Sequence, residues 1–377
     1  MIYNEYGKTG LNVSAVGFGG MRFDEKKSHK ENAQLLQHAY DRGINYFDTA
    51  PLYCSDTSED IFGVAIKQMA SFRDKFYVST KGMPTEFDTA KKAVGAVKKS
   101  LKRLKTDYLD FYHVWCIRSM DQYRLAMKPG GQYEGLMKLK EQGIIRNIVI
   151  STHLRGDDVA TIVDEGHFEG VLLGVNVLNF MYRWKGVCAA HDARCGVVAM
   201  NPLSGGMIPK FESELGFIAS EGETPTEAAI RFCVASPEIT IALIGFTTAE
   251  HIDTACKIAD NCQPFTSDDL DRIKANVTEN MDRICTGCGY CMSTCPQNIP
   301  IANYMQFYNN KAMFHKTDEE MIKDLDFEHQ WGLLVGRDAD AADCTQCAQC
   351  EKACTQHIDI IKRLAQLAQW ETKLEAK

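Results

Sequence analysis

Residues 108–115 read YLDFYHVW, a nearly continuous run of apolar and aromatic side chains. A strand has this composition when helices cover both faces of its sheet, because neither face then meets water. Seven more short runs of this kind lie between residues 15 and 246, separated by helical segments. The eight predicted strands are residues 15–20, 45–50, 76–81, 108–115, 146–152, 171–179, 196–203 and 240–246.

The segments between these runs have the period of amphipathic helices. Residues 89–105 are an example, with lysines filling the polar face. Their apolar positions recur every three or four residues, at Val94, Val97, Leu101 and Leu104. Buried strands that alternate with helices predict an α/β fold with a parallel sheet. Eight such units within about 265 residues favour a (β/α)8 TIM barrel over an open doubly wound sheet.

The composition limits the domain organisation and the partners. The chain has 377 residues and a net charge of -8, and 45% of its residues are hydrophobic. We expect a barrel over residues 1–265 and a second domain over residues 266–377. The acidic balance argues against a nucleic-acid partner. The first ten residues contain no apolar leader, and no run of 18 apolar residues follows, so the sequence predicts a cytoplasmic protein without membrane contact.

Four polar side chains fall at neighbouring strand ends, where TIM barrels carry their catalytic residues. Asp48 lies near the end of the second predicted strand, Tyr53 in the loop after it, Lys81 at the end of the third and His113 in the fourth. Taken singly, each residue is as readily a helix cap, a solvated lysine or a core histidine. Together, at three adjacent strand ends, they favour catalysis.

The same four residues predict a particular chemistry. A tyrosine has an ordinary pKa of about 10, and the Lys81 ammonium beside it would lower that pKa. Asp48 would keep the lysine charged, and His113 would orient a carbonyl oxygen or share the proton with Tyr53. We therefore expect proton transfer at a carbonyl or alcohol oxygen while hydride moves at carbon.

The region up to about residue 260 resembles the aldo/keto reductases. The matching stretches are YGKTGLNVSAVGFGGMR (6–22), GINYFDTAPLYCSDTSEDIFG (43–63), FYVSTKG (76–82), LDFYHVW (109–115), GIIRNIVISTH (143–153), NPLSGG (201–206) and TPTEAAIRFCVASPEITIALIG (224–245). The resemblance implies that Asp48, Tyr53, Lys81 and His113 form the catalytic tetrad of that family.

The resemblance also implies a nicotinamide cofactor, NADH or NADPH, across the barrel mouth. Ser151 would hold its carboxamide, and Met200 would stack on its ring. The other implied contacts are Gly19, Met21, Asn176, Leu203, Ser204, Gly206 and Gly245. His251 and Ala255 stand where the family commonly has an arginine for the 2'-phosphate and an asparagine for the adenine. We therefore hypothesise weak or NADH-biased binding.

Eight of the fifteen cysteines form two runs with C-x2-C-x2-C-x3-C spacing, CTGCGYCMSTCP (285–296) and CTQCAQCEKACT (344–355). This spacing indicates two [4Fe-4S] clusters, whereas zinc, the alternative, usually takes two C-x2-C pairs. In two-cluster ferredoxins, the fourth cysteine of each run binds the other cluster. The expected ligand sets are Cys285, Cys288, Cys291 and Cys354 for one cluster and Cys344, Cys347, Cys350 and Cys295 for the other. We interpret the seven scattered cysteines as buried reduced thiols.

The second domain is predicted to be mostly helical, with helices within residues 303–316 and 318–325. A barrel followed by a ferredoxin-like domain resembles the iron-sulfur branch of the aldo/keto reductases. We expect an NAD(P)-dependent oxidoreductase acting on a small carbonyl or alcohol, with clusters that exchange electrons with a ferredoxin-like partner or serve structure. Two alternatives remain: a reductase driven through the clusters, with a vestigial nicotinamide site, and a non-enzymatic electron-transfer protein.

Overall fold

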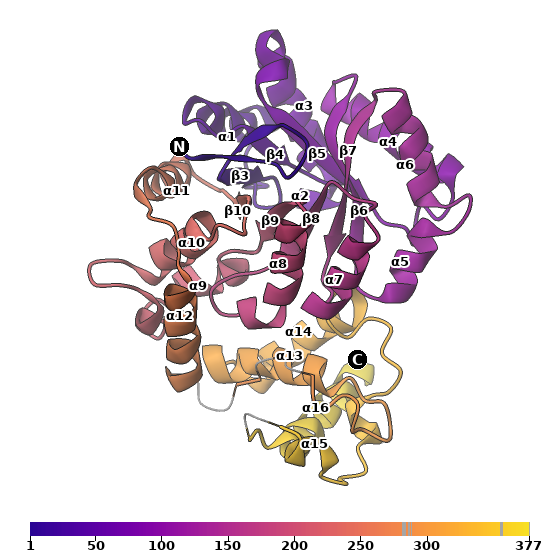
Figure 1. The fold of residues 1–377 in the computed structure, drawn as a ribbon, viewed down its shortest axis with the longest axis vertical. Helices are drawn as coiled ribbons and strands as arrows, with labels where there is room; N and C mark the ends of the chain where they lie inside the picture. Colours follow the sequence, from indigo (N-terminus) through magenta and orange to yellow (C-terminus); the bar gives the residue numbers. More distant parts are fainter. Residues whose placement is uncertain (281–283, 286, 288, 355–356, 377) are drawn as a thin grey trace. The chain divides into compact units, whose positions relative to one another are not determined.

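The computed structural model describes the whole chain except residues 281–283, 286, 288, 355–356 and 377. Its internal contacts divide the described chain into two compact units, which we describe separately (Figure 1). The barrel unit consists of Met1–Val177, Arg183–Glu212 and Ala219–Thr266. The tail unit consists of Leu178–Tyr182, Ser213–Ile218 and Ser267–Lys377.

Eight parallel strands close the barrel in the order β10-β3-β4-β5-β6-β7-β8-β9. Their bounds are β3 (Val16–Gly19), β4 (Tyr46–Asp48), β5 (Tyr77–Gly82), β6 (Leu109–Ile117), β7 (Ile145–Thr152), β8 (Gly170–Gly174), β9 (Gly196–Met200) and β10 (Ile241–Gly245). The predicted TIM barrel is confirmed. The sixth strand ends earlier than predicted, at Gly174, and residues 175–179 leave the sheet.

Helices surround these strands (Figure 1). They are α1 (His29–Asp41), α3 (Ser58–Gln68), α4 (Ala90–Leu104), α5 (Met120–Met127), α6 (Gln132–Glu141), α7 (Gly156–Asp164), α8 (Trp184–Asp192), α9 (Met207–Lys210), α10 (Pro225–Ala235) and α11 (Ala249–Asn261). The predicted helix at residues 89–105 is α4, which begins where the Thr89 hydroxyl accepts a hydrogen bond from the Lys92 amide. Val97 and Leu104 are fully buried on its inner face.

A short hairpin of β1 (Tyr3–Glu5) and β2 (Asn12–Ser14), which the sequence analysis did not predict, precedes the barrel. Tyr6, in the turn of this hairpin, packs into the apolar cluster at the starts of the strands, against Tyr46 and Phe111. A Cβ atom at Gly196 would lie only 2.3 Å from the Tyr6 ring. Glycine at this strand start therefore makes room for the aromatic side chain inside the barrel.

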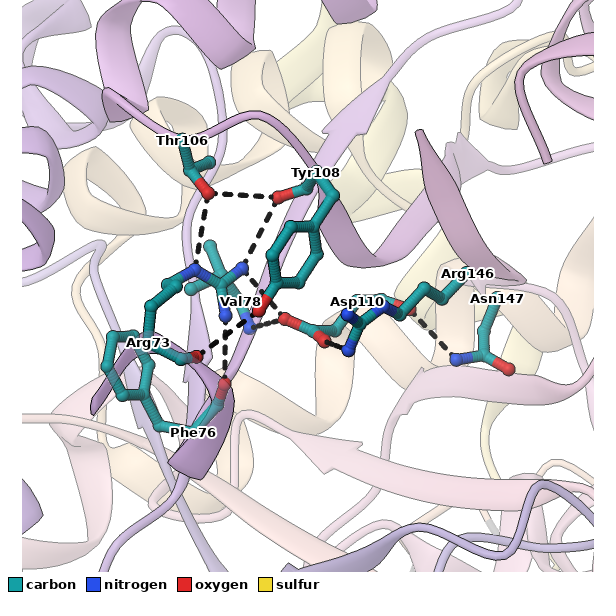
Figure 2. Close-up of polar contacts among 8 residues, drawn as sticks. All are labelled: Arg73, Phe76, Val78, Thr106, Tyr108, Asp110, Arg146 and Asn147. Carbon is teal, nitrogen blue, oxygen red and sulfur yellow. Dashed lines mark hydrogen bonds and ion pairs between the residues drawn. The ribbon is translucent and has the colours of Figure 1, made fainter. Parts of the chain in front are cut away.

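A polar network joins β5, β6 and β7 at their N-terminal ends, and Figure 2 shows it. The buried Asp110 carboxylate accepts hydrogen bonds from the Arg73 guanidinium at 2.9 Å and the Val78 amide at 3.0 Å. Arg146 lies 3.1 Å from the other carboxylate oxygen, and Asn147 donates to the Asp110 carbonyl at 2.9 Å. Because TIM barrels work at the opposite end, this network serves stability.

The tail unit is mostly helical, as predicted. It contains α12 (Ser267–Asn280), α13 (Ile301–Phe314), α14 (Asp318–Trp331), α15 (Gln349–Lys352) and α16 (Ile360–Glu375). The two predicted helices correspond to α13 and α14. Tyr304, Leu364 and Trp370 are fully buried in a core of its own. No helix in the described ranges has both the length and the apolar composition that a membrane span requires.

Candidate active site

Three of the four predicted catalytic side chains lie at the C-terminal ends of adjacent strands. Asp48 is the last residue of β4, and Lys81 on β5 is in register with His113 on β6. Each of these three residues is at most 1% exposed. Tyr53 begins α2 (Tyr53–Asp56), a single turn in the loop after β4, and is half-buried. The fold thus brings residues 65 positions apart in the chain, Asp48 to His113, to one mouth.

The Asp48 carboxylate is the centre of the site. The Lys81 ammonium donates to one of its oxygens and also to the Thr49 carbonyl, at 2.9 Å. The Ser79 hydroxyl donates to the other oxygen. A buried charge is tolerated when it is paired and hydrogen-bonded, as both charges are here. Burial lowers the pKa of Lys81, and the neighbouring Asp48 carboxylate opposes that shift.

The aromatic ring of Tyr53 faces the ammonium group of Lys81. The Lys81 nitrogen lies 5.1 Å from the ring centroid, and the Trp115 ring contacts Tyr53 edge-on with centroids 5.8 Å apart. The Tyr53 hydroxyl forms no hydrogen bond to Lys81 or His113 in the described structure. Burial, and then the Asp48 charge, raise the pKa of Tyr53 well above its ordinary value of 10. The sequence predicted a lowered pKa, whereas the pKa is raised, because burial and the Asp48 charge are the largest influences on Tyr53.

His113 is neutral in this site. Burial and the Lys81 charge lower its pKa well below the ordinary 6.5. Its Nε2 atom lies 3.6 Å from Asp48, too far for a hydrogen bond, and neither ring nitrogen has another partner among the described residues. The buried Ser151 hydroxyl on β7 is likewise without a hydrogen-bond partner. Buried polar atoms are normally paired, so these atoms fit a ligand in the mouth.

The predicted nicotinamide contacts also lie at the C-terminal end of the barrel. Gly19 and Gly245 end β3 and β10 and are in register, and Met200 ends β9. Met21 follows β3 and is 54% exposed. Asn176, after β8, is fully buried and donates to the Asn201 carbonyl at 3.0 Å.

The loop after β9 holds three further predicted contacts. Leu203 and Ser204 are half-buried, and Gly206 is exposed. The backbone φ is positive at Ser204, Gly205 and Gly206, with values of 50°, 69° and 92°. An added Cβ at Gly206 would meet nothing within 4 Å, which leaves its backbone open to a ligand.

His251 and Ala255 lie on α11, near its start and in its middle. The His251 ring is 3.1 Å from the Thr247 hydroxyl, in an exposed position. Ala255 is fully buried against the rest of the barrel unit. Neither residue is the arginine or the asparagine that the family resemblance implies at these positions.

The two cysteine runs meet in the tail unit. One cavity is lined by Cys295 of the first run and by Cys344, Cys347 and Cys350 of the second. These four residues are the set predicted for one cluster. The rest of the lining includes the apolar side chains Ile299, Ile301, Ile361 and Leu364.

The other predicted set is described in part. Cys285 and Cys291 are buried and Cys354 is half-buried, whereas Cys288 lies outside the described residues. The charge of Arg363, on α16, interacts with Cys285 and Cys354. Among the described residues, no three His, Cys, Asp or Glu side chains converge on a point that could hold a single metal ion.

The scattered cysteines only partly fit the interpretation as buried thiols. Those that are buried are Cys116, Cys195, Cys233 and Cys256, and those that are half-buried are Cys54, Cys188 and Cys262. Burial raises the pKa of the Cys54 thiol, next to Tyr53, so it remains a thiol at neutral pH.

Comparison with known proteins decides the family. Residues 15–277 match the sequence model of the aldo/keto reductase family. This chain is an aldo/keto reductase. Residues 284–360 match the model of the 4Fe-4S dicluster domain, so this aldo/keto reductase also carries an iron-sulfur type of C-terminal domain. Family membership makes the chain an oxidoreductase.

Relatives of this aldo/keto reductase cover most of its barrel. It is 29% identical to L-galactose dehydrogenase from Arabidopsis thaliana over 283 residues, 66% of this chain and 84% of the relative. The solved holo form of aldo-keto reductase AKR11C1 from Bacillus halodurans has a TM-score of 0.62 at 22% identity, over 73% of this chain and 96% of that one. An aldo-keto reductase from Klebsiella pneumoniae, solved in complex with NADPH, has a TM-score of 0.59 at 18% identity, over 73% and 95%. These two solved structures support the fold.

Two groups that bind the central charges of this aldo/keto reductase were not predicted from its sequence. Ser79 precedes Lys81 by two positions on β5, and residues two apart on a strand share a face. That spacing was a usable signal. The Thr49 carbonyl that accepts a hydrogen bond from Lys81 is a backbone group, so the residue type at this position could not predict it.

Proposed function

We propose that this aldo/keto reductase reduces a carbonyl group with a nicotinamide dinucleotide and that Tyr53 supplies the proton to the carbonyl oxygen. One observation carries this proposal: the Tyr53 ring faces a buried Asp48–Lys81 pair, and the neutral His113 lies 3.6 Å from the same Asp48 carboxylate. Roles of this kind need groups that differ in acidity and lie within reach of one oxygen atom.

The electrostatics favour reduction over alcohol oxidation. Reduction requires a protonated Tyr53, and the raised pKa keeps the proton on Tyr53 at neutral pH. Oxidation would require the phenolate, which burial and the Asp48 carboxylate both disfavour. His113, as a neutral imidazole, offers one N–H group that can donate to the substrate oxygen and hold it near Tyr53.

The residues at the mouth fit a nicotinamide cofactor, which supplies hydride when bound. The unpaired Ser151 hydroxyl would bond its carboxamide, Met200 would pack on its ring, and the open backbone at Gly206 would meet its pyrophosphate. The Klebsiella pneumoniae relative was solved with NADPH. Here the 2'-phosphate would meet His251 in place of an arginine, so we propose weak or NADH-biased binding.

We further propose that residues 266–377 form a ferredoxin-like domain with two [4Fe-4S] clusters. Cys344, Cys347, Cys350 and Cys295 would bind one cluster, and Cys285, Cys288, Cys291 and Cys354 the other. The cavity lined by the first four thiols supports this assignment, because it joins residues from both runs. Each cluster supplies one electron at a time, so a ferredoxin-like protein is the fitting redox partner.

The test uses the full chain purified anaerobically, with 4-nitrobenzaldehyde as the probe carbonyl and NADH or NADPH as the reductant. Tyr53→Phe should lower kcat by at least about 100-fold and leave iron content unchanged. Tyr133→Phe, on the outer helix α6, is the matched control and should keep full activity. Wild-type protein that reduces the aldehyde only with dithionite-reduced clusters, and with neither nicotinamide, would refute this proposal and favour the cluster-driven alternative.

A further inference from the structure

The turn that carries Tyr53 has an unusual backbone. The φ angle is positive at Leu52 (70°), Cys54 (53°), Ser55 (52°) and Asp56 (62°). Residues with a Cβ atom rarely adopt this left-handed conformation, because the Cβ crowds the following carbonyl oxygen. Four such residues around one tyrosine require contacts from elsewhere to hold them.

Arg103 of α4 supplies those contacts through Asp56. The Asp56 Oδ1 atom accepts a hydrogen bond from the Leu52 amide at 3.0 Å. The same atom accepts from Arg103 Nη1 at 2.7 Å, and Arg103 Nη2 donates to the Asp56 carbonyl. One arginine thus fixes the side chain and the backbone of the last residue of the turn. Through Asp56 it also fixes Leu52, on the other side of Tyr53.

Arg103 is itself held in place. It lies near the end of α4, where its side chain is 13% exposed, and its Nη2 atom donates to Asp60 at 2.8 Å. It is also 3.3 Å from Glu59, which is 1% exposed. A Cβ atom on Gly63 of α3 would lie 2.1 Å from the Arg103 carbonyl, so the two helices are in direct contact there. An isolated surface ion pair contributes little, but this guanidinium is anchored by three carboxylates.

We propose that Arg103 is a positioning residue for catalysis, which holds Asp56 and thereby sets the strained turn that places Tyr53 against Lys81 and Trp115. This inference rests on the proposed role of Tyr53. We call the hydrogen bonds between Arg103 and Asp56 the clamp. When the clamp is lost, the turn relaxes toward ordinary backbone angles and Tyr53 moves away from its reacting position. A displacement of about 1 Å at a catalytic group lowers rates by up to about 100-fold.

The test compares three variants of the full anaerobic protein. Asp56→Ala removes the clamp at an exposed position, so folding is retained. Arg103→Lys keeps the positive charge but removes the guanidinium group that donates two hydrogen bonds to Asp56. Arg73→Gln, in the network at the other end of the barrel, is the matched control for a buried arginine. The measurements are kcat and KM for 4-nitrobenzaldehyde, thermal unfolding, and hydrogen exchange of the peptide spanning residues 51–57.

Asp56→Ala should lower kcat by about tenfold or more, change KM by less than threefold and speed up exchange in residues 51–57. Arg103→Lys should have an intermediate effect. Arg73→Gln should lower the unfolding temperature yet leave kcat and this exchange unchanged. Normal kcat in Asp56→Ala would overturn the inference, and so would an equal loss of kcat in Arg73→Gln. If Tyr53→Phe is active, the proposed function fails, and unchanged exchange in Asp56→Ala would then refute the clamp independently.

Discussion

Replacing Lys81 with methionine removes the only ammonium that pairs with Asp48 among the described residues and keeps most of the apolar stem. Lys81 and Asp48 are each 1% exposed, so the carboxylate left behind cannot be solvated by water. Breaking a buried pair in this way costs about 3–5 kcal/mol. Ser79 still donates one hydrogen bond, which places the expected loss near the lower end of that range.

The assay is urea unfolding of the full anaerobic chain, followed by far-ultraviolet circular dichroism. Lys92→Met is the matched control, because Lys92 forms a 2.7 Å pair with Asp88 but is 58% exposed. An exposed pair contributes about 0–1 kcal/mol, so this variant should remain close to wild type.

A second substitution separates a lost pair from lost packing. Adding Asp48→Asn to Lys81→Met removes the uncompensated charge and should recover most of the stability, because replacing both partners of a buried pair is often nearly neutral. The reasoning is refuted if Lys81→Met costs no more than Lys92→Met, or if Asp48→Asn restores nothing.

Three further predictions concern the cysteine runs, the mouth and α16. Cys295→Ser should halve the iron content, from about eight to about four atoms per chain by chemical assay; full retention would contradict the crossed ligand sets. His153 has a pKa of about 4, because it is buried near Arg183 and Arg118. As the pH falls, His153 therefore binds a proton in the unfolded chain before it does so in the folded chain. The free energy of unfolding should fall by about 2 kcal/mol between pH 7.5 and pH 5, measured by urea unfolding at each pH, and by less in His153→Asn. Arg363→Gln should lower the reduction potential of one cluster in an EPR-monitored titration, because a nearby cation stabilises the reduced cluster. Lys362→Gln, at the exposed neighbouring residue, is the control and should leave that potential unchanged. Equal shifts in the two variants would contradict this placement of Arg363.

The sequence predicted the parts of this protein that depend on local pattern. Each barrel strand is a short apolar run, and α4 has a helical period that can be read within 15 residues, so the strands and this helix were found near their observed positions. The N-terminal hairpin was missed because its strands have only three residues each, too few for a periodic signal. Its role depends on Tyr6 reaching Gly170 and Gly196, which lie 164 and 190 residues further along the chain.

The sequence by itself determined which chemical groups stand at the strand ends and how many thiolates the tail offers, because residue type and spacing carry that information. Only the tertiary structure decided how those groups act on one another. Burial, and then the Asp48 charge, raise the Tyr53 pKa, and neither effect can be read from the residue types. The Tyr53 turn is held by Arg103, 47 residues from Asp56 in the chain. Charge interactions depend on distance and burial, and the chain sets both only when it folds.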